Sequence, residues 1–153
     1  MKISCLQTKP KETIEQALDE AIDLASIAVK DGSKFLFLPE YCGGIVSNGK
    51  LYTPPSETEK NHLFLKEFKK FCEKNSIWSL NGSIAIKLEN KKIVNRSFFV
   101  NSKGKIVNKY DKIHIFDIAL DGEEHYESST IDFGSKGILT QTELGLIGHS
   151  ICY

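Results

Sequence analysis

Apolar residues recur along the chain with two different periods, and the change between them predicts the fold class. After Pro10 they recur at the three- and four-residue spacing of an amphipathic helix as far as Val29, and Gly32 suits the position just beyond its end. Strands are predicted on either side, at residues 2–7 and in the KFLFLP run that Pro39 ends. This order predicts a right-handed strand–helix–strand opening.

The middle of the chain predicts a loop and a second helix. Residues 41–55 are rich in Gly, Asn and Pro, as expected of a loop. Ser56 and Glu59 have the spacing of a capping box, and apolar residues recur at helical spacing from Leu63 to Cys72. We therefore predict a second helix that Ser56 caps at its N-terminus.

From residue 77 the period changes to two, which is typical of strands. The segments IWSLNGSIAIKL, KIVNRSFFVN and KIVNKYDKIHIF predict three successive strands, with turns between them. Residues 117–135 read as a polar loop, and GILTQTELGLIGHSICY predicts two short final strands. With no repeat or linker, the pattern predicts one α/β domain over residues 1–153, layered, with mixed parallel and antiparallel pairing.

Composition excludes several classes of function. Twenty basic and twenty acidic residues give a formal net charge of zero, so no global field recruits nucleic acid or an anionic membrane. The N-terminal sequence lacks the apolar core of a signal peptide, and no stretch approaches about 18 uninterrupted apolar residues. We expect a cytoplasmic protein whose four widely spaced cysteines are mostly free thiols. No metal-ligand pattern joins these cysteines to the four histidines, so we expect no metal.

Three residues depart from the patterns around them. Glu40 directly follows the apolar FLFLP strand, at the end where ligands gather in α/β sheets. Strand alternation puts Lys112 on one face with His114 and Phe116, and puts Cys152 on one face of the last strand. Each has an ordinary alternative: a solvated loop carboxylate, a lysine in water, and a core cysteine.

The sequence offers no clear partner for a cysteine–histidine pair. His149 is three positions from Cys152 and points to the opposite face of the predicted strand. His114 and His125 remain formally open as bases, because no spacing rule selects either. Ser150 lacks the second glycine of a G-x-S-x-G elbow and is a poor candidate for a nucleophile.

Taken together and in order, three segments resemble the signature of the nitrilase (carbon–nitrogen hydrolase) superfamily. These are FLFLPEYCGG, KYDKIHIFD and GLIGHSICY, which correspond to the family's Glu after an apolar strand and proline, its Lys in K-x-H-hydrophobe-F, and its Cys in G-x-x-C-Y/W. The hairpin NRSFFVNSKGK is also similar, and the closest branch is that of ω-amidase-like enzymes. The resemblance implies an α-β-β-α sandwich.

The resemblance also implies roles for these residues. Cys152 would be the nucleophile, Glu40 the general base and Lys112 the cation that stabilises the oxyanion, with the backbone N–H of Tyr153 as a second donor. The family often has a second glutamate in the following loop, and Glu127 in GEEHYESS is the best match; Glu123 and Glu124 are weaker candidates, and a solvated acidic loop is the alternative. The thioester route on a small-molecule amide needs no cofactor.

The resemblance stops one residue after Cys152, whereas family members continue with further strands and helices. We therefore expect a truncated form of the sandwich, reduced to roughly its first part, with an uncovered sheet face. One hypothesis is an amide hydrolase whose missing half is supplied in trans. The other is a catalytically inactive remnant that acts, if at all, as an interaction module. A homo-oligomer is the further partner that an uncovered sheet predicts.

Overall fold

The computed structural model describes residues 1–47, 52–120 and 123–152, and its centre is a mixed seven-stranded sheet. The strands run in the order β1-β2-β6-β7-β11, with β5 beside β6 and β8 beside β7. Pairing is parallel for β1–β2, β2–β6, β5–β6 and β7–β11, and antiparallel for β6–β7 and β7–β8, which confirms the predicted mixture. The strands are β1 (Lys2–Cys5), β2 (Ser33–Phe37), β5 (Ser56–Glu57), β6 (Trp78–Lys87), β7 (Ile93–Val100), β8 (Ile106–Asp111) and β11 (Ile131–Asp132).

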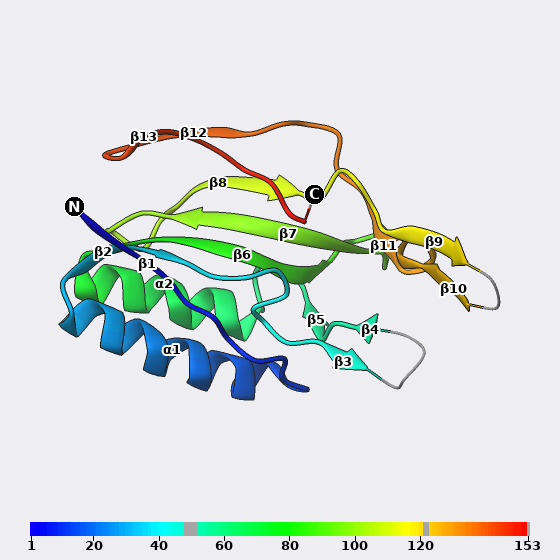
Figure 1. Cartoon of the computed structure of the whole chain (residues 1–153), viewed down its shortest axis with the longest axis horizontal. Coiled ribbons are helices and arrows are strands. Elements are labelled where there is room, and N and C mark those ends of the chain that lie inside the picture. The colour runs from blue at the N-terminus through cyan, green and yellow to red at the C-terminus, as the bar shows by residue number, and fades with distance from the viewer. Residues whose placement is uncertain (48–51, 121–122, 153) are drawn as a thin grey trace.

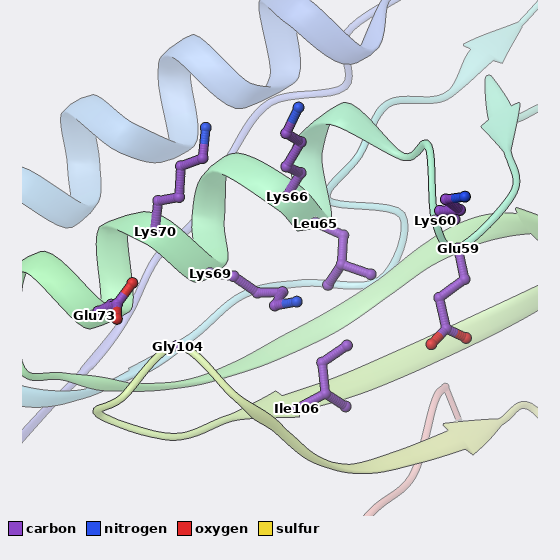
Figure 2. Close-up of a pocket in the computed structure, with 9 residues that line it drawn as sticks. All are labelled: Glu59, Lys60, Leu65, Lys66, Lys69, Lys70, Glu73, Gly104 and Ile106. Atoms are coloured by element: carbon purple, nitrogen blue, oxygen red, sulfur yellow. The ribbon is translucent and has the colours of Figure 1, made fainter.

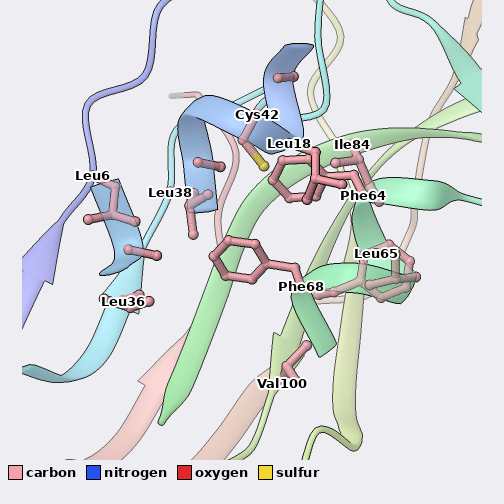
Figure 3. Packing of buried hydrophobic residues seen from close by; sticks show 14 of the residues in the cluster. Leu6, Leu18, Leu36, Leu38, Cys42, Phe64, Leu65, Phe68, Ile84 and Val100 are labelled. Atoms are coloured by element: carbon pink, nitrogen blue, oxygen red, sulfur yellow. The ribbon is translucent and has the colours of Figure 1, made fainter. Parts of the chain in front are cut away.

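Two helices, α1 (Ile14–Lys30) and α2 (Leu63–Asn75), cover one face of this sheet (Figure 1). Thr13 caps α1 by accepting a hydrogen bond from the Gln16 amide at 3.3 Å, and Gly32 follows the helix with φ +83°. The main core forms between the helices and the sheet, where apolar side chains from both interlock (Figure 3). Its labelled members include Leu18, Phe64 and Phe68 from the helices and Leu36, Ile84 and Val100 from the strands.

The predicted capping box at Ser56 and Glu59 is wrong. Ser56 belongs to β5, which pairs with the end of β6, and α2 begins only at Leu63. The Glu59 carboxylate accepts hydrogen bonds from Arg96 at 2.9 Å and from Lys109 at 3.0 Å instead of turning back to a helix. Two cations from β7 and β8 therefore outcompete the local turn for this side chain.

The opposite face of the sheet is crossed by a hairpin of β12 (Leu139–Thr142) and β13 (Gly145–Gly148) (Figure 1). These are the two predicted final strands. Thr140 and Thr142 are buried, whereas Leu139 and Leu146 are each 62% exposed. The hairpin thus turns its polar side chains towards the sheet and its leucines outward. Helices, sheet and hairpin form successive layers, in agreement with the predicted sandwich class.

The segment 117–135, predicted to be a polar loop, contains further structure. It forms a hairpin of β9 (Asp117–Leu120) and β10 (Glu123–Tyr126), a short 3-10 helix η1 (Glu127–Ser129), and β11. The β9–β10 hairpin projects beyond the end of the sheet (Figure 1). A second small hairpin pairs β3 (Val46–Ser47) with β4 (Tyr52–Thr53). Within the described ranges, no helix is long and apolar enough to cross a membrane.

Candidate active site

Glu40 lies on a turn that is held against a bulge in β6. The register of β6 with β7 is irregular between Asn81 and Ile84. There the Ser83 amide donates to the Pro39 carbonyl at 3.2 Å, and the Tyr41 amide donates to Ser83 Oγ at 2.9 Å. Bulges commonly re-aim a chain next to active sites. This one fixes the main chain on both sides of Glu40.

Lys112 follows directly after β8 and is almost completely buried. Its amide donates to the Asn95 carbonyl at 2.9 Å, and its side chain is 4% exposed. Its ammonium lies 3.0 Å from Glu40 Oε1 and 3.0 Å from Glu127 Oε2. The predicted strand face shared with His114 and Phe116 is wrong, because β8 ends at Asp111. The solvated alternative for Lys112 is therefore wrong as well.

The charge of Lys112 is set by its two partners. Burial on its own would lower the pKa of Lys112, but hydrogen bonds and charges from Glu127 and Glu40 outweigh burial and raise the pKa above its ordinary value. The lysine is therefore a fixed cation at neutral pH. With two carboxylates around it, the cluster has one negative charge more than it has positive charges.

Glu127 lies at the start of η1 with its side chain mostly shielded from solvent, so the alternative of a solvated acidic side chain is wrong for it. Its side chain is 10% exposed, and it accepts hydrogen bonds from the Phe116 amide at 2.8 Å and the Tyr41 hydroxyl at 3.0 Å. Burial, followed by the charge of Glu127, raises the pKa of Tyr41 well above its usual range, so this phenol is a neutral donor. Glu124 is exposed, and the side chain of Glu123 lies outside the described residues.

Asn95 is a member of the site that the sequence did not single out. It is fully buried on β7, and its Nδ2 donates to Glu40 Oε1 at 2.8 Å. The available signal was a polar residue among the apolar positions of a predicted interior strand. Tyr41 was also missed as a site residue, and it has a left-handed backbone with φ +52°. Such strain in a residue that is not glycine concentrates at functional sites.

Cys152 lines a cavity of about 280 Å³ together with Glu40, Lys112, Glu127 and Tyr41. It is exposed, has φ +61°, and lies beyond the end of β13 at Gly148. The prediction that it shares a strand face is therefore wrong, as is the alternative of a core cysteine. Tyr153, whose amide was predicted to be an oxyanion donor, lies outside the described residues.

The other cysteines and the histidines take no part in this cluster where they are described. Cys42 and Cys72 are buried, and burial raises their pKa values to about 12 and about 11, whereas Cys5 is exposed. His149 bonds to Thr140 at 2.7 Å, His114 is exposed, and the side chain of His125 lies outside the described residues. In the described part of the chain, no three acidic, His or Cys side chains gather into a metal site.

A larger hollow of about 660 Å³ lies between α2 and β8, away from this cluster (Figure 2). Leu65 and Ile106 face each other across it, and four lysines surround it. No cysteine lines it, and of its two carboxylates, Glu59 and Glu73, the first is already engaged by Arg96 and Lys109. The smaller cavity, where a thiol, a cation and two carboxylates meet, is therefore the candidate active site.

Comparisons with known proteins identify relatives of the chain. A family model described as "Carbon-nitrogen hydrolase" matches residues 2–153. "Nitrilase homolog 2" from Dictyostelium discoideum is 31% identical over 154 residues, covering 99% of this chain and 46% of that protein. "Deaminated glutathione amidase" from the same organism is 28% identical over 155 residues, covering 95% and 49%. The chain thus spans about half the length of these curated relatives.

Solved structures share the fold. The C. elegans NitFhit protein superposes with a TM-score of 0.83 at 23% identity, over 99% of this chain and 37% of that one. Saccharomyces cerevisiae Nit3, described as a member of branch 10 of the nitrilase superfamily, gives 0.78 at 24% identity, over 97% and 53%. The arrangement of helices, sheet and hairpin is therefore the one found in these proteins.

Proposed function

The chain belongs to the carbon-nitrogen hydrolase family, and on that premise we propose that it takes part in the hydrolysis of a small-molecule amide through a cysteine thioester. One observation carries the proposal: the Lys112 ammonium is buried between Glu40 and Glu127, 3.0 Å from each, in the cavity that Cys152 lines. A buried cation with two carboxylates beside an accessible thiol suits the making of a thiolate and the stabilising of an oxyanion.

In the proposed first half-reaction, Glu40 takes the proton of the Cys152 thiol, and the thiolate attacks the amide carbon. Lys112 donates a hydrogen bond to the oxygen that becomes negative. The C–N bond then breaks as Glu40 returns its proton to the nitrogen, which releases ammonia and leaves a thioester on Cys152. Lys112 keeps its own proton throughout, because both neighbouring carboxylates favour its charged form.

In the second half-reaction, water loses a proton to Glu40 and attacks the thioester carbon. The C–S bond breaks, the carboxylic acid leaves, and Glu40 returns the proton to the Cys152 sulfur. Protons and electron pairs balance without a cofactor. The left-handed backbone of Cys152, with φ +61°, supports the proposal, because such strain in a residue that is not glycine concentrates at functional sites.

The substrate class is also a proposal. The cavity of about 280 Å³ suits a small amide, and its described wall combines two carboxylates with Phe116, Ile45 and Ile131. Relatives carry the names deaminated glutathione amidase and omega-amidase. We therefore propose small ω-amides ahead of nitriles. We also propose a cytoplasmic location, where thiols stay reduced.

The direct test is ammonia release by the purified protein on a panel of small ω-amides. We expect turnover that disappears in Cys152→Ala and persists in Cys5→Ala, the other exposed cysteine. Loss of turnover in both variants, or retention in both, would contradict the assignment of the nucleophile. Absence of turnover on every amide in the wild-type protein would contradict the enzymatic proposal itself.

An interaction module is the second candidate, and the outward leucines of the β12–β13 hairpin favour it. Leu139 and Leu146 are each 62% exposed, and Leu144 is 40% exposed. We propose that further polypeptide covers this face, either in trans or from a second copy of the chain. Size-exclusion chromatography with light scattering tests this: a monodisperse monomer at all concentrations would contradict it, and Leu146→Ser should weaken any assembly.

A further inference from the structure

The two oxygens of the Glu40 carboxylate have different surroundings. Oε1 accepts from Lys112 Nζ at 3.0 Å and from Asn95 Nδ2 at 2.8 Å. No described residue donates to Oε2. We propose that Asn95 is a positioning residue that holds Glu40 by Oε1 and so leaves Oε2 as the proton acceptor for Cys152. This inference rests on the proposed function of the same site.

Glu127, the other carboxylate beside Lys112, differs from Glu40 in the number of donors to its oxygens. Its Oε1 accepts from the Tyr41 hydroxyl at 3.0 Å and from Lys112 at 3.3 Å, and its Oε2 accepts from Lys112 at 3.0 Å and from the Phe116 amide at 2.8 Å. Both oxygens of Glu127 therefore have two donors each. Of the two glutamates that share Lys112, only Glu40 keeps an oxygen without a described donor, because Asn95 and Lys112 both donate to its other oxygen.

The burial of Asn95 indicates a role beyond packing. The residue is fully buried, and its Oδ1 has no hydrogen-bond partner among the described residues. A buried amide with one acceptor unpaired is less stable than an apolar residue of the same shape. Two residues along the same strand, Ser97 is equally buried but donates its hydroxyl to the Asn81 carbonyl. The Asn95 amide group donates to the Glu40 carboxylate and also hydrogen-bonds with the hydroxyl of Tyr41, so it joins two members of the cluster.

Removing this amide takes a hydrogen-bond donor away from the carboxylate that acts as the proposed base. A donor to a carboxylate favours its charged form, so its loss makes the proton harder to remove. The acid limb of any reaction that needs Glu40 as a base should then move to higher pH, by about one unit for one charge-assisted hydrogen bond. Asn95→Asp should move it further, because it places a second negative charge beside Glu40.

The experiment measures alkylation of Cys152 by iodoacetamide against pH, in a Cys5→Ser background, with peptide mass spectrometry to locate the label. Asn95→Leu keeps a side chain of similar size and removes the donor. Asn95→Asp also adds a negative charge and so tests the direction of the pH shift. Ser97→Ala is the matched control on the same strand. We expect the midpoint of the acid limb to rise by about one unit in Asn95→Leu and by more in Asn95→Asp, and to stay in place in Ser97→Ala.

An unchanged midpoint in folded Asn95→Leu would overturn the inference, as would an equal shift in Ser97→Ala. If Asn95→Leu fails to fold, Asn95→Asp decides the question, because its midpoint must rise. Alkylation does not depend on turnover, so the two proposals fail separately. A wild-type protein that releases no ammonia contradicts the proposed function, whereas pH profiles that Asn95 does not move contradict its positioning role.

Discussion

A single methyl group at Gly82 tests how the bulge in β6 positions the site. A Cβ at this residue would lie closer than 3.0 Å to the Leu38 carbonyl oxygen and to the carbonyl carbon and oxygen of Pro39. All three are main-chain atoms, which cannot rotate out of the way as a flexible side chain can. In Gly82→Ala, the chain on which Glu40 sits must therefore move.

The expected loss of activity in Gly82→Ala follows from how close the added Cβ would lie to these main-chain atoms. Restoring ordinary contact, which begins at 3.4 Å, requires the Leu38 and Pro39 peptides to move away from Gly82 by at least about 1 Å. Glu40 is the next residue, and its bonds of 3.0 Å to Lys112 and 2.8 Å to Asn95 would lengthen past hydrogen-bonding range. A misplacement of about 1 Å costs roughly 100-fold in rate. Overpacking should lower the free energy of unfolding by about 1–3 kcal/mol.

The assay compares kcat/KM for ammonia release with the free energy of unfolding in urea, for Gly82→Ala and for Gly137→Ala. A Cβ at Gly137 meets nothing within 4 Å, so this control should match the wild type. We expect a folded Gly82→Ala protein with activity reduced about 100-fold. Wild-type activity and stability in Gly82→Ala would refute the reasoning, and so would an equal loss in Gly137→Ala.

Two further predictions concern buried charge. Lys112→Met should abolish turnover and lower the free energy of unfolding by about 3 kcal/mol at neutral pH, because it leaves the mostly buried Glu127 and the partly exposed Glu40 without their cation; undiminished stability in urea would contradict this. Burial lowers the pKa of His62 to about 4, below about 6.5 in the unfolded chain, so stability is lost as pH falls from the unfolded value towards the folded one. Between about pH 7.5 and pH 5 the free energy of unfolding of the wild type should fall by about 2 kcal/mol more than that of His62→Leu. Equal falls in the two proteins, measured by urea unfolding at each pH, would contradict this.

Much of the architecture could be predicted because periodicity reports burial directly. The helical spacing before Val29 matches the buried face of α1. The period-two segments did form β6 and β7, but β7 is buried on both faces, so its polar residues Asn95 and Ser97 are buried as well. Glu40, Lys112, Glu127 and Cys152 could be selected because three motifs occur in a fixed order. The structure brings all four to one cavity.

The errors came from side chains with distant partners. The local pattern at Ser56 and Glu59 matches a helix cap, but β6 recruits Ser56 into a sheet, and Arg96 and Lys109 recruit Glu59. Asn95 was missed because its partner, Glu40, lies 55 residues away in sequence. The alternation of polar and apolar residues continues past Asp111 in the sequence and predicted a longer strand. The strand ends at Asp111, and the Lys112 side chain that follows is buried. Such competition between local and long-range partners has no sequence signature within a single window.

The order in which the strands pair has a consequence for folding. Strands β6, β7 and β8 are neighbours in sequence and pair antiparallel, so they can form early and already join Lys112 to Asn95 through the main chain. Glu40 arrives only when β2 pairs in parallel with β6 across the intervening helix, a slower non-local step. We expect a refolding chain to regain the circular dichroism of its secondary structure before its activity. In that interval the Lys112 ammonium is still hydrated and has not yet met Glu40.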